Sequence, residues 1–215
     1  MEITWFGHSF VRVRDKSITI AVDPYSPTLG LSPVKVFADV VLITHKHENH
    51  SYLQAIKGEY KLIDGPGEYE IKEAFITGFA TYHDSKEGQE LGKNTVYVVE
   101  LDRLRICHLG DLGHLLDEVT LEQIGEIDVL LIPVGGGNSL KASEAAEVIG
   151  QIEPKIVVPI HYSLPGIKVP LDPVEKFLKE VGSEQSVAQP RLNIASAPSD
   201  DTTRFVVLEA AGGRG

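Results

Sequence analysis

Three histidines stand within the six residues from His45 to His50, in the segment Thr44-His45-Lys46-His47-Glu48-Asn49-His50. They follow the apolar run 40–43, which is typical of a buried strand. Imidazole is the commonest protein ligand for zinc and similar divalent ions, and a strand end can present side chains to solvent and substrate. The segment therefore predicts a metal site. The alternative is a solvated loop that happens to be rich in histidine.

Further candidate ligands lie at the ends of other predicted strands, where several could converge on one sheet edge. His83 follows the predicted strand 75–82, Asp111 follows 104–109, and His161 ends 156–160. A carboxylate among imidazoles is what a divalent metal site with an open water position requires. The remaining histidines are His8, His108 and His114.

In type and order these residues resemble the signature of the metallo-β-lactamase superfamily: His-x-His-x-Asp-His after an apolar strand, then a lone His, a Gly-Asp and a final His. Shorter segments look like the branch that includes L-ascorbate-6-phosphate lactonase and N-acyl-phosphatidylethanolamine phospholipase D. These segments are Trp5-Phe6-Gly7-His8-Ser9, Val22-Asp23-Pro24, Gly110-Asp111, Ile132-Pro133-Val134-Gly135-Gly136 and Pro159-Ile160-His161-Tyr162. The resemblance implies an α/β fold of the α+β type, a four-layer αββα sandwich.

The resemblance also implies two sets of metal ligands. The first comprises His45, His47 and His83; Asp111 bridges to the second, which comprises His50, His161 and the residue at position 49. The family has Asp at that position, whereas Asn49 is neutral and so is a poorer ligand for a dication. The implied cofactor is one or two divalent metal ions, zinc foremost, with manganese or iron as alternatives.

Asn49 leaves three interpretations open: a single ion in the three-histidine set, two ions of which the second is weakly bound, or a site that has lost hydrolysis. Asp111 and Asn49 are the catalytic candidates, because the residue at position 49 in the family helps to hold and orient the attacking water. Glu48 is anionic, but a one-residue offset normally points a side chain elsewhere.

Three more residues are candidates for supporting the site or lining its pocket. Asp23 is expected to brace the histidine loop by hydrogen bonding, with turn capping as the alternative. His8 is expected to line the pocket or bind substrate, unless it is an ordinary hydrogen-bonded histidine. His114 reaches the pocket rim or lies in a surface loop. The glycine-rich stretch 135–139 lacks the ending of a phosphate-binding loop, so we interpret it as a turn that passes close to the metal pocket.

The composition narrows the function further. The chain has 215 residues, a formal charge of −11 and no basic cluster, which disfavours a polyanionic partner such as RNA. The first residues show neither the basic start nor the apolar core expected of a signal peptide. The single cysteine cannot form an internal disulfide, and no apolar run is long enough to span a bilayer. We expect a cytoplasmic metal-dependent hydrolase acting on a small-molecule ester, lactone or phosphodiester, without a membrane partner. The rival is a non-catalytic metal-binding member of the same fold. A homo-oligomer is compatible with either.

The elements expected to position these residues are mostly strands. They are predicted at 2–6, 10–14, 17–22, 40–43, 61–63, 68–71, 75–82, 95–100, 104–109, 129–134, 156–160, 192–195 and 204–208. A short helix is expected at 51–56, a second beginning at Ser143, and a third at 174–181, capped by Asp172 with Pro173 at its first position. One domain is expected over 1–211, followed by a disordered tail, 212–215.

Overall fold

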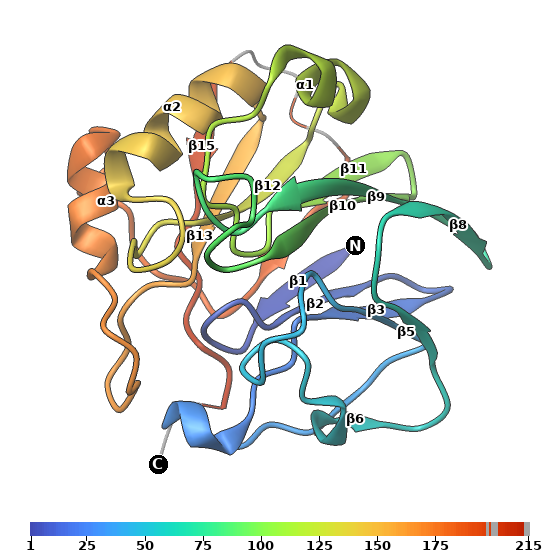
Figure 1. Ribbon diagram of the computed structural model, residues 1–215. Helices are drawn as coiled ribbons and strands as arrows, with labels where there is room; N and C mark the ends of the chain where they lie inside the picture. Colours follow the sequence, from blue (N-terminus) through green and yellow to red (C-terminus); the bar gives the residue numbers. More distant parts are fainter. Residues whose placement is uncertain (197, 199–201, 213–215) are drawn as a thin grey trace.

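The computed structural model describes residues 1–196, 198 and 202–212. Within these residues two β-sheets pack face to face, and three α-helices lie on the outer side of one of them (Figure 1). The predicted sandwich is therefore confirmed. The described part of the chain contains no helix long and apolar enough to cross a membrane.

The first sheet has six strands among the described residues, in the spatial order β14-β1-β2-β3-β5-β7. Their bounds are β1 (Glu2–Trp5), β2 (Val11–Arg14), β3 (Thr19–Val22), β5 (Val40–Leu42), β7 (Lys61–Ile63) and β14 (Leu192–Asn193). β2 is antiparallel to both β1 and β3, and β3, β5 and β7 are parallel. The carboxyl ends of β1, β3 and β5 consequently lie at the same edge of the sheet.

The second sheet has seven strands in the described part, in the order β15-β13-β12-β11-β10-β9-β8. Their bounds are β8 (Gly67–Ile71), β9 (Ala74–Tyr82), β10 (Lys93–Leu101), β11 (Leu104–His108), β12 (Val129–Pro133), β13 (Ile156–Ile160) and β15 (Arg204–Phe205). β10 is antiparallel to β9 and β11, whereas β11, β12, β13 and β15 run parallel. The carboxyl ends of β9, β11 and β13 therefore also share one edge.

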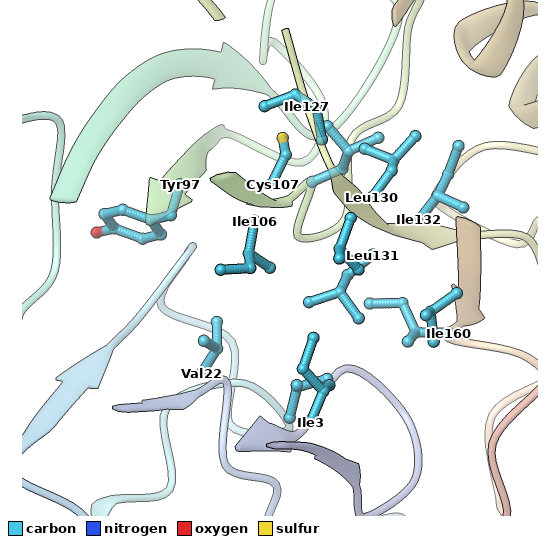
Figure 2. Packing of buried hydrophobic residues seen from close by; sticks show 14 of the residues in the cluster. Ile3, Val22, Tyr97, Ile106, Cys107, Ile127, Leu130, Leu131, Ile132 and Ile160 are labelled. Atoms are coloured by element: carbon cyan, nitrogen blue, oxygen red, sulfur yellow. The ribbon is translucent and has the colours of Figure 1, made fainter. Parts of the chain in front are cut away.

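The helices α1 (Glu118–Ile124), α2 (Ala142–Ile152) and α3 (Val174–Glu180) cover the outer face of the second sheet. Every residue of β12 and β13 is buried, because one face meets the helices and the other meets the first sheet. Figure 2 shows this two-sided packing on β11: Cys107 lies beside Ile127, and Ile106 points across the sandwich toward Val22.

The outer face of the first sheet differs from the expected fourth, helical layer. A second apolar cluster covers it, with Leu29 from the 3₁₀ turn η1 (Pro27–Leu29), Ala55 from η2 (Leu53–Ala55), and the strand pair β4 (Val36–Phe37) and β6 (Ile56–Lys57). The prolines at 24, 27 and 33 break any continuous α-helix before β4, so short turns and a two-stranded sheet bury this face instead.

Three helix predictions need correction. The helix expected at 51–56 is only the turn η2, which passes directly into β6. α2 begins at Ala142 with Lys141 as its cap, not Ser143, because the Glu144 carboxylate accepts a hydrogen bond from the Lys141 amide at 2.8 Å. α3 begins at Val174 with Pro173 as its cap.

α1 was not expected, although Asp117 caps it by accepting a hydrogen bond from the Thr120 amide at 2.7 Å. The strands β14 and β15 are shorter than predicted, at two residues each. Of the expected disordered tail, 213–215 lies outside the described residues, and the single domain over 1–211 stays a prediction.

Candidate metal centre

The candidate ligands meet at one edge of the sandwich, because each of them follows the carboxyl end of a strand. The first sheet supplies His8 after β1, Asp23 after β3 and the histidine loop after β5; the second supplies His83 after β9, Asp111 after β11 and His161 after β13. The two sheets are joined next to the histidine loop. The Tyr97 hydroxyl donates to the Ile43 carbonyl at 3.1 Å, and the Thr95 amide donates to the Thr44 carbonyl at 2.9 Å.

Asp111 lies at the centre of the cluster. Its Oδ2 is 3.1 Å from His50 Nε2, 3.2 Å from His161 Nε2, 3.3 Å from His83 Nε2 and 3.8 Å from His45 Nε2. Its other carboxylate oxygen accepts a hydrogen bond from the Ser9 hydroxyl at 3.3 Å. A buried carboxylate facing four imidazole nitrogens is the arrangement expected of a group that bridges two cations.

The histidines form two sets whose ligand nitrogens lie within 4.8 Å of one another. One set is His45, His47 and His83, and the other is His8, His50 and His161. In the first set His47 is exposed, whereas the second is buried throughout. The first set has the composition that the sequence predicts; the second contains His8 in addition to the predicted His50 and His161. Which residues bind metal stays a prediction.

Hydrogen bonds that Asp23 accepts determine which ring nitrogen His45 and His50 turn toward the centre of the cluster. The Thr44 hydroxyl donates to Asp23 Oδ2 at 2.6 Å, so its oxygen is left to accept from His45 Nδ1 at 2.9 Å. His50 Nδ1 donates to the same Asp23 carboxylate at 3.0 Å. With Nδ1 carrying the proton, a neutral His45 or His50 presents a lone pair on Nε2 toward Asp111. These are the contacts expected of a residue that braces the histidine loop, the role predicted for Asp23.

The glycine-rich turn after β12 orients the two histidines of the second sheet, His83 and His161, in the same way. His83 Nδ1 donates to the Asn138 carbonyl at 3.0 Å. The Ser139 hydroxyl donates to the Gly136 carbonyl at 3.1 Å and is left to accept from His161 Nδ1 at 3.3 Å. Nε2 therefore again faces the centre. The interpretation of 135–139 as a turn close to the pocket agrees with these contacts.

The pKa values of the clustered residues are shifted by burial and by the charges of their neighbours. Burial, and then the neighbouring His50, lower the pKa of His45 to about 2. Burial also lowers the pKa of His50, but Asp111 and Asp23 outweigh it and raise that pKa to about 10. Burial opposes ionisation of Asp111, yet the adjacent His161 and His50 hold its pKa well below the usual range. Asp111 is therefore ionised, and neighbouring positive charge stabilises its carboxylate.

Buried polar atoms without partners show that the residues fit a metal ion. Nε2 of His45 and Nε2 of His83 are buried and make no hydrogen bond; the 3.3 Å approach of His83 to Asp111 lacks hydrogen-bond geometry. Oδ1 of Asn49 and Nδ1 of His8 are also buried and unpartnered. Native proteins rarely leave buried polar atoms unsatisfied unless an ion, water or substrate pairs with them.

The two residues around the departure from the family signature behave differently. Asn49 lines the cavity, and its buried side-chain oxygen has no partner. Glu48 also lines the cavity, but its carboxylate accepts a hydrogen bond from the Ser26 hydroxyl at 2.9 Å. The Glu48 carboxylate is thus already engaged by Ser26, whereas the oxygen of Asn49 has no partner.

A cavity of about 390 Å³ opens over the cluster, lined by all the candidate ligands except His45 and also by the apolar residues Val169, Pro170 and Leu171. The apolar wall was not foreseen, because nothing in these three residue types indicates a site. His114 does not line this cavity. It accepts a hydrogen bond from the Tyr82 amide and donates to the Leu115 carbonyl, so the surface-loop alternative holds.

Comparison with known proteins agrees with this geometry. The family described as the beta-lactamase superfamily domain matches residues 2–161. A UPF0173 protein of Pyrococcus furiosus is 31% identical over 84% of this chain and 90% of its own. A UPF0173 metal-dependent hydrolase of Thermococcus onnurineus is 30% identical over 87% of this chain and 95% of its own.

Among solved structures, a crystal structure from Thermotoga maritima, of a proposed Zn-dependent hydrolase of the metallo-beta-lactamase superfamily, is 36% identical. Its TM-score is 0.78, and the match covers 97% of this chain and 98% of that one. The chain belongs to the beta-lactamase superfamily, and its relatives include the UPF0173 proteins. The predicted superfamily is confirmed, whereas the lactonase and phospholipase branch stays a prediction.

Proposed function

We propose that this protein is a metal-dependent hydrolase of a small ester, lactone or phosphodiester. The observation that carries the proposal is the convergence of the Nε2 atoms of four oriented histidines on the single carboxylate of Asp111. Such a nitrogen-rich set favours zinc or iron over magnesium or calcium. The names of the relatives point the same way.

The residues divide the work of such a reaction. His45, His47 and His83 would hold an ion, which when bound supplies a water of lowered pKa and polarises a carbonyl or phosphoryl oxygen. Asp111 supplies the anionic charge that holds the cluster together. Asn49 lines the cavity, and its unpartnered Oδ1 would accept a hydrogen bond from the attacking water and so orient it. The apolar wall at Val169–Leu171 excludes bulk water and receives the apolar part of a substrate.

The test is metal analysis of the purified protein combined with turnover of generic phosphodiester and lactone substrates. We expect bound transition metal and turnover in the wild type, and a loss of about 100-fold or more in His47→Ala, because a ligand and the orientation of the water are lost together. Metal-loaded protein without turnover, or turnover that His47→Ala leaves unchanged, contradicts the proposal.

A second candidate function, metal binding without catalysis, is favoured by Asn49, since a neutral amide holds neither a dication nor a water as firmly as a carboxylate does. Asn49→Asp separates the two. A large gain in rate together with metal content would indicate a degraded site. A fall in rate would show that the amide suits this protein's own reaction.

A further inference from the structure

His8 is placed as a ligand would be, although its sequence context left its role open. It lies in the turn after β1, beyond Phe6 and Gly7, and its side chain is buried, with 2% of the residue exposed. Its ring centroid lies 4.3 Å from that of His161 and 4.6 Å from that of His50. The ligand nitrogens of the three residues lie within 4.8 Å of one another, close enough to share one ion.

The contrast with His108 shows that His8 is not simply a buried histidine satisfied by the fold. His108 is equally buried, but its Nε2 lies 3.0 Å from the Ser9 carbonyl and its Nδ1 accepts from the Gly110 amide at 3.0 Å. His8 Nδ1 is buried and has no partner. Leaving a buried polar nitrogen unpaired costs free energy, so a histidine kept in this state at the cavity calls for a ligand.

The backbone fixes His8 relative to the second histidine set. Its carbonyl accepts hydrogen bonds from Trp5 Nε1 at 2.8 Å and from the His161 amide at 2.9 Å. His8 and His161 both have left-handed backbone, with φ of 53° and 52°. Non-glycine residues adopt this conformation at a cost, and it is retained where the surroundings enforce it, often at functional sites.

We propose that His8 is a ligand of a second metal ion, which it holds together with His50, His161 and Asp111. Its imidazole supplies a strong donor where the neutral Asn49 offers only an amide oxygen, so a complete second site survives the missing carboxylate. The inference rests on the proposed function only in taking the cluster to be a metal centre. It is tested by metal binding, without reference to turnover.

The experiment is zinc loading of chelator-treated protein, followed by metal content per chain and calorimetric titration. His8→Asn removes the imidazole but keeps a residue that tolerates left-handed backbone; His114→Asn is the matched control outside the cavity. We expect two zinc ions per chain in the wild type and in His114→Asn. His8→Asn should retain one, with the second bound more than about 100-fold more weakly, since even supporting residues of metal sites cost 10–100-fold.

A measurement on the wild type keeps the test decisive if His8→Asn folds poorly. With nitrogen-15 in the histidine rings, full zinc loading should shift six of the eight imidazoles and leave His108 and His114 unchanged. One zinc ion per chain in the wild type, unchanged affinity for two ions in His8→Asn, or only five shifted rings would overturn the inference. Two bound ions without any hydrolysis would overturn the proposed function instead.

Discussion

At the scale of single residues, the nitrogen that a histidine turns toward the cavity is decided by what its other nitrogen contacts. Asp23 shows this most clearly, because its carboxylate is fully buried and can only accept hydrogen bonds. It receives the Thr44 amide at 2.8 Å as well as the hydroxyl of the same residue. The hydrogen bonds from His45 to Thr44 and from Thr44 to Asp23 therefore place the His45 proton on Nδ1, although the carboxylate does not contact the imidazole directly.

Thr44→Val is the test of that chain, because valine keeps the shape of threonine and removes only the hydroxyl. We expect metal affinity to fall by about 10–100-fold, the usual effect of losing a group that orients a ligating histidine. Thr44→Ser keeps the hydroxyl and is the matched control. Competition with a zinc chelator measures both variants, and equal affinities for Thr44→Val and the wild type would contradict the role of the hydroxyl.

At the scale of elements, the turn after β12 provides the hydrogen-bond partners of His83 and His161. Gly135 lets this turn pack closely against the backbone of His161. The Gly135 amide donates to the His161 carbonyl at 3.0 Å, and a Cβ at Gly135 would lie 2.3 Å from that carbonyl oxygen. No flexible side chain can yield there, because the obstructing atom belongs to the backbone. The close approach is therefore available to glycine alone.

Gly135→Ala is expected to destabilise the fold by about 1–3 kcal/mol, as overpacking in a rigid region does, and to displace His161. The matched control is Gly150→Ala within α2, where an added Cβ meets nothing within 4 Å. That variant should be more stable by about 0.5–1 kcal/mol, because alanine favours a helix over glycine. Urea unfolding in the presence of a chelator measures both, and a neutral Gly135→Ala would contradict the packing argument.

The elements also show what the sequence could and could not reveal. The apolar runs of β12 and β13 were recognisable because parallel strands covered on both faces need no polar positions. The seven-residue α1 was missed, although Asp117 is a cap signal, because so short a helix has little periodicity. The turns and the two-stranded sheet that cover the outer face of the first sheet could not be predicted, because they depend on tertiary packing of loops.

The site divides in the same way. The convergence of His45, His83 and His161 on one sheet edge could be predicted, because each of them follows the carboxyl end of a strand. The hydrogen bond between His83 and the Asn138 carbonyl could not be predicted from the sequence, because every residue has a carbonyl and only the folded loop places this one next to His83. His8 and His114 were both candidates for the pocket, and the structure buries His8 but leaves His114 half-buried outside the cavity.

At the scale of the whole molecule, the candidate ligands come from both sheets, so a bound ion would tie the two halves of the sandwich together. Binding to the folded state alone stabilises it by RT ln(1 + [L]/Kd), about 4 kcal/mol at a metal concentration 1,000 times the Kd. The reactivity of the Cys107 thiol can be used to measure this stabilisation. It is the single cysteine of the chain, it is buried on β11 between the sheet and its helices, and burial raises the pKa of its thiol.

Alkylation of Cys107 should therefore require that the core opens. We expect iodoacetamide to leave the thiol of the native protein almost unmodified, to alkylate it rapidly in concentrated guanidinium chloride, and to react more slowly when zinc is bound, by up to about 1,000-fold under the conditions above. Mass spectrometry of samples quenched over time measures the rate, with Cys107→Ala as the blank. Zinc should not slow the reaction in His47→Ala to the same extent. Fast alkylation in native buffer, or a rate that zinc leaves unchanged in metal-loaded wild type, would contradict a core closed by the metal centre.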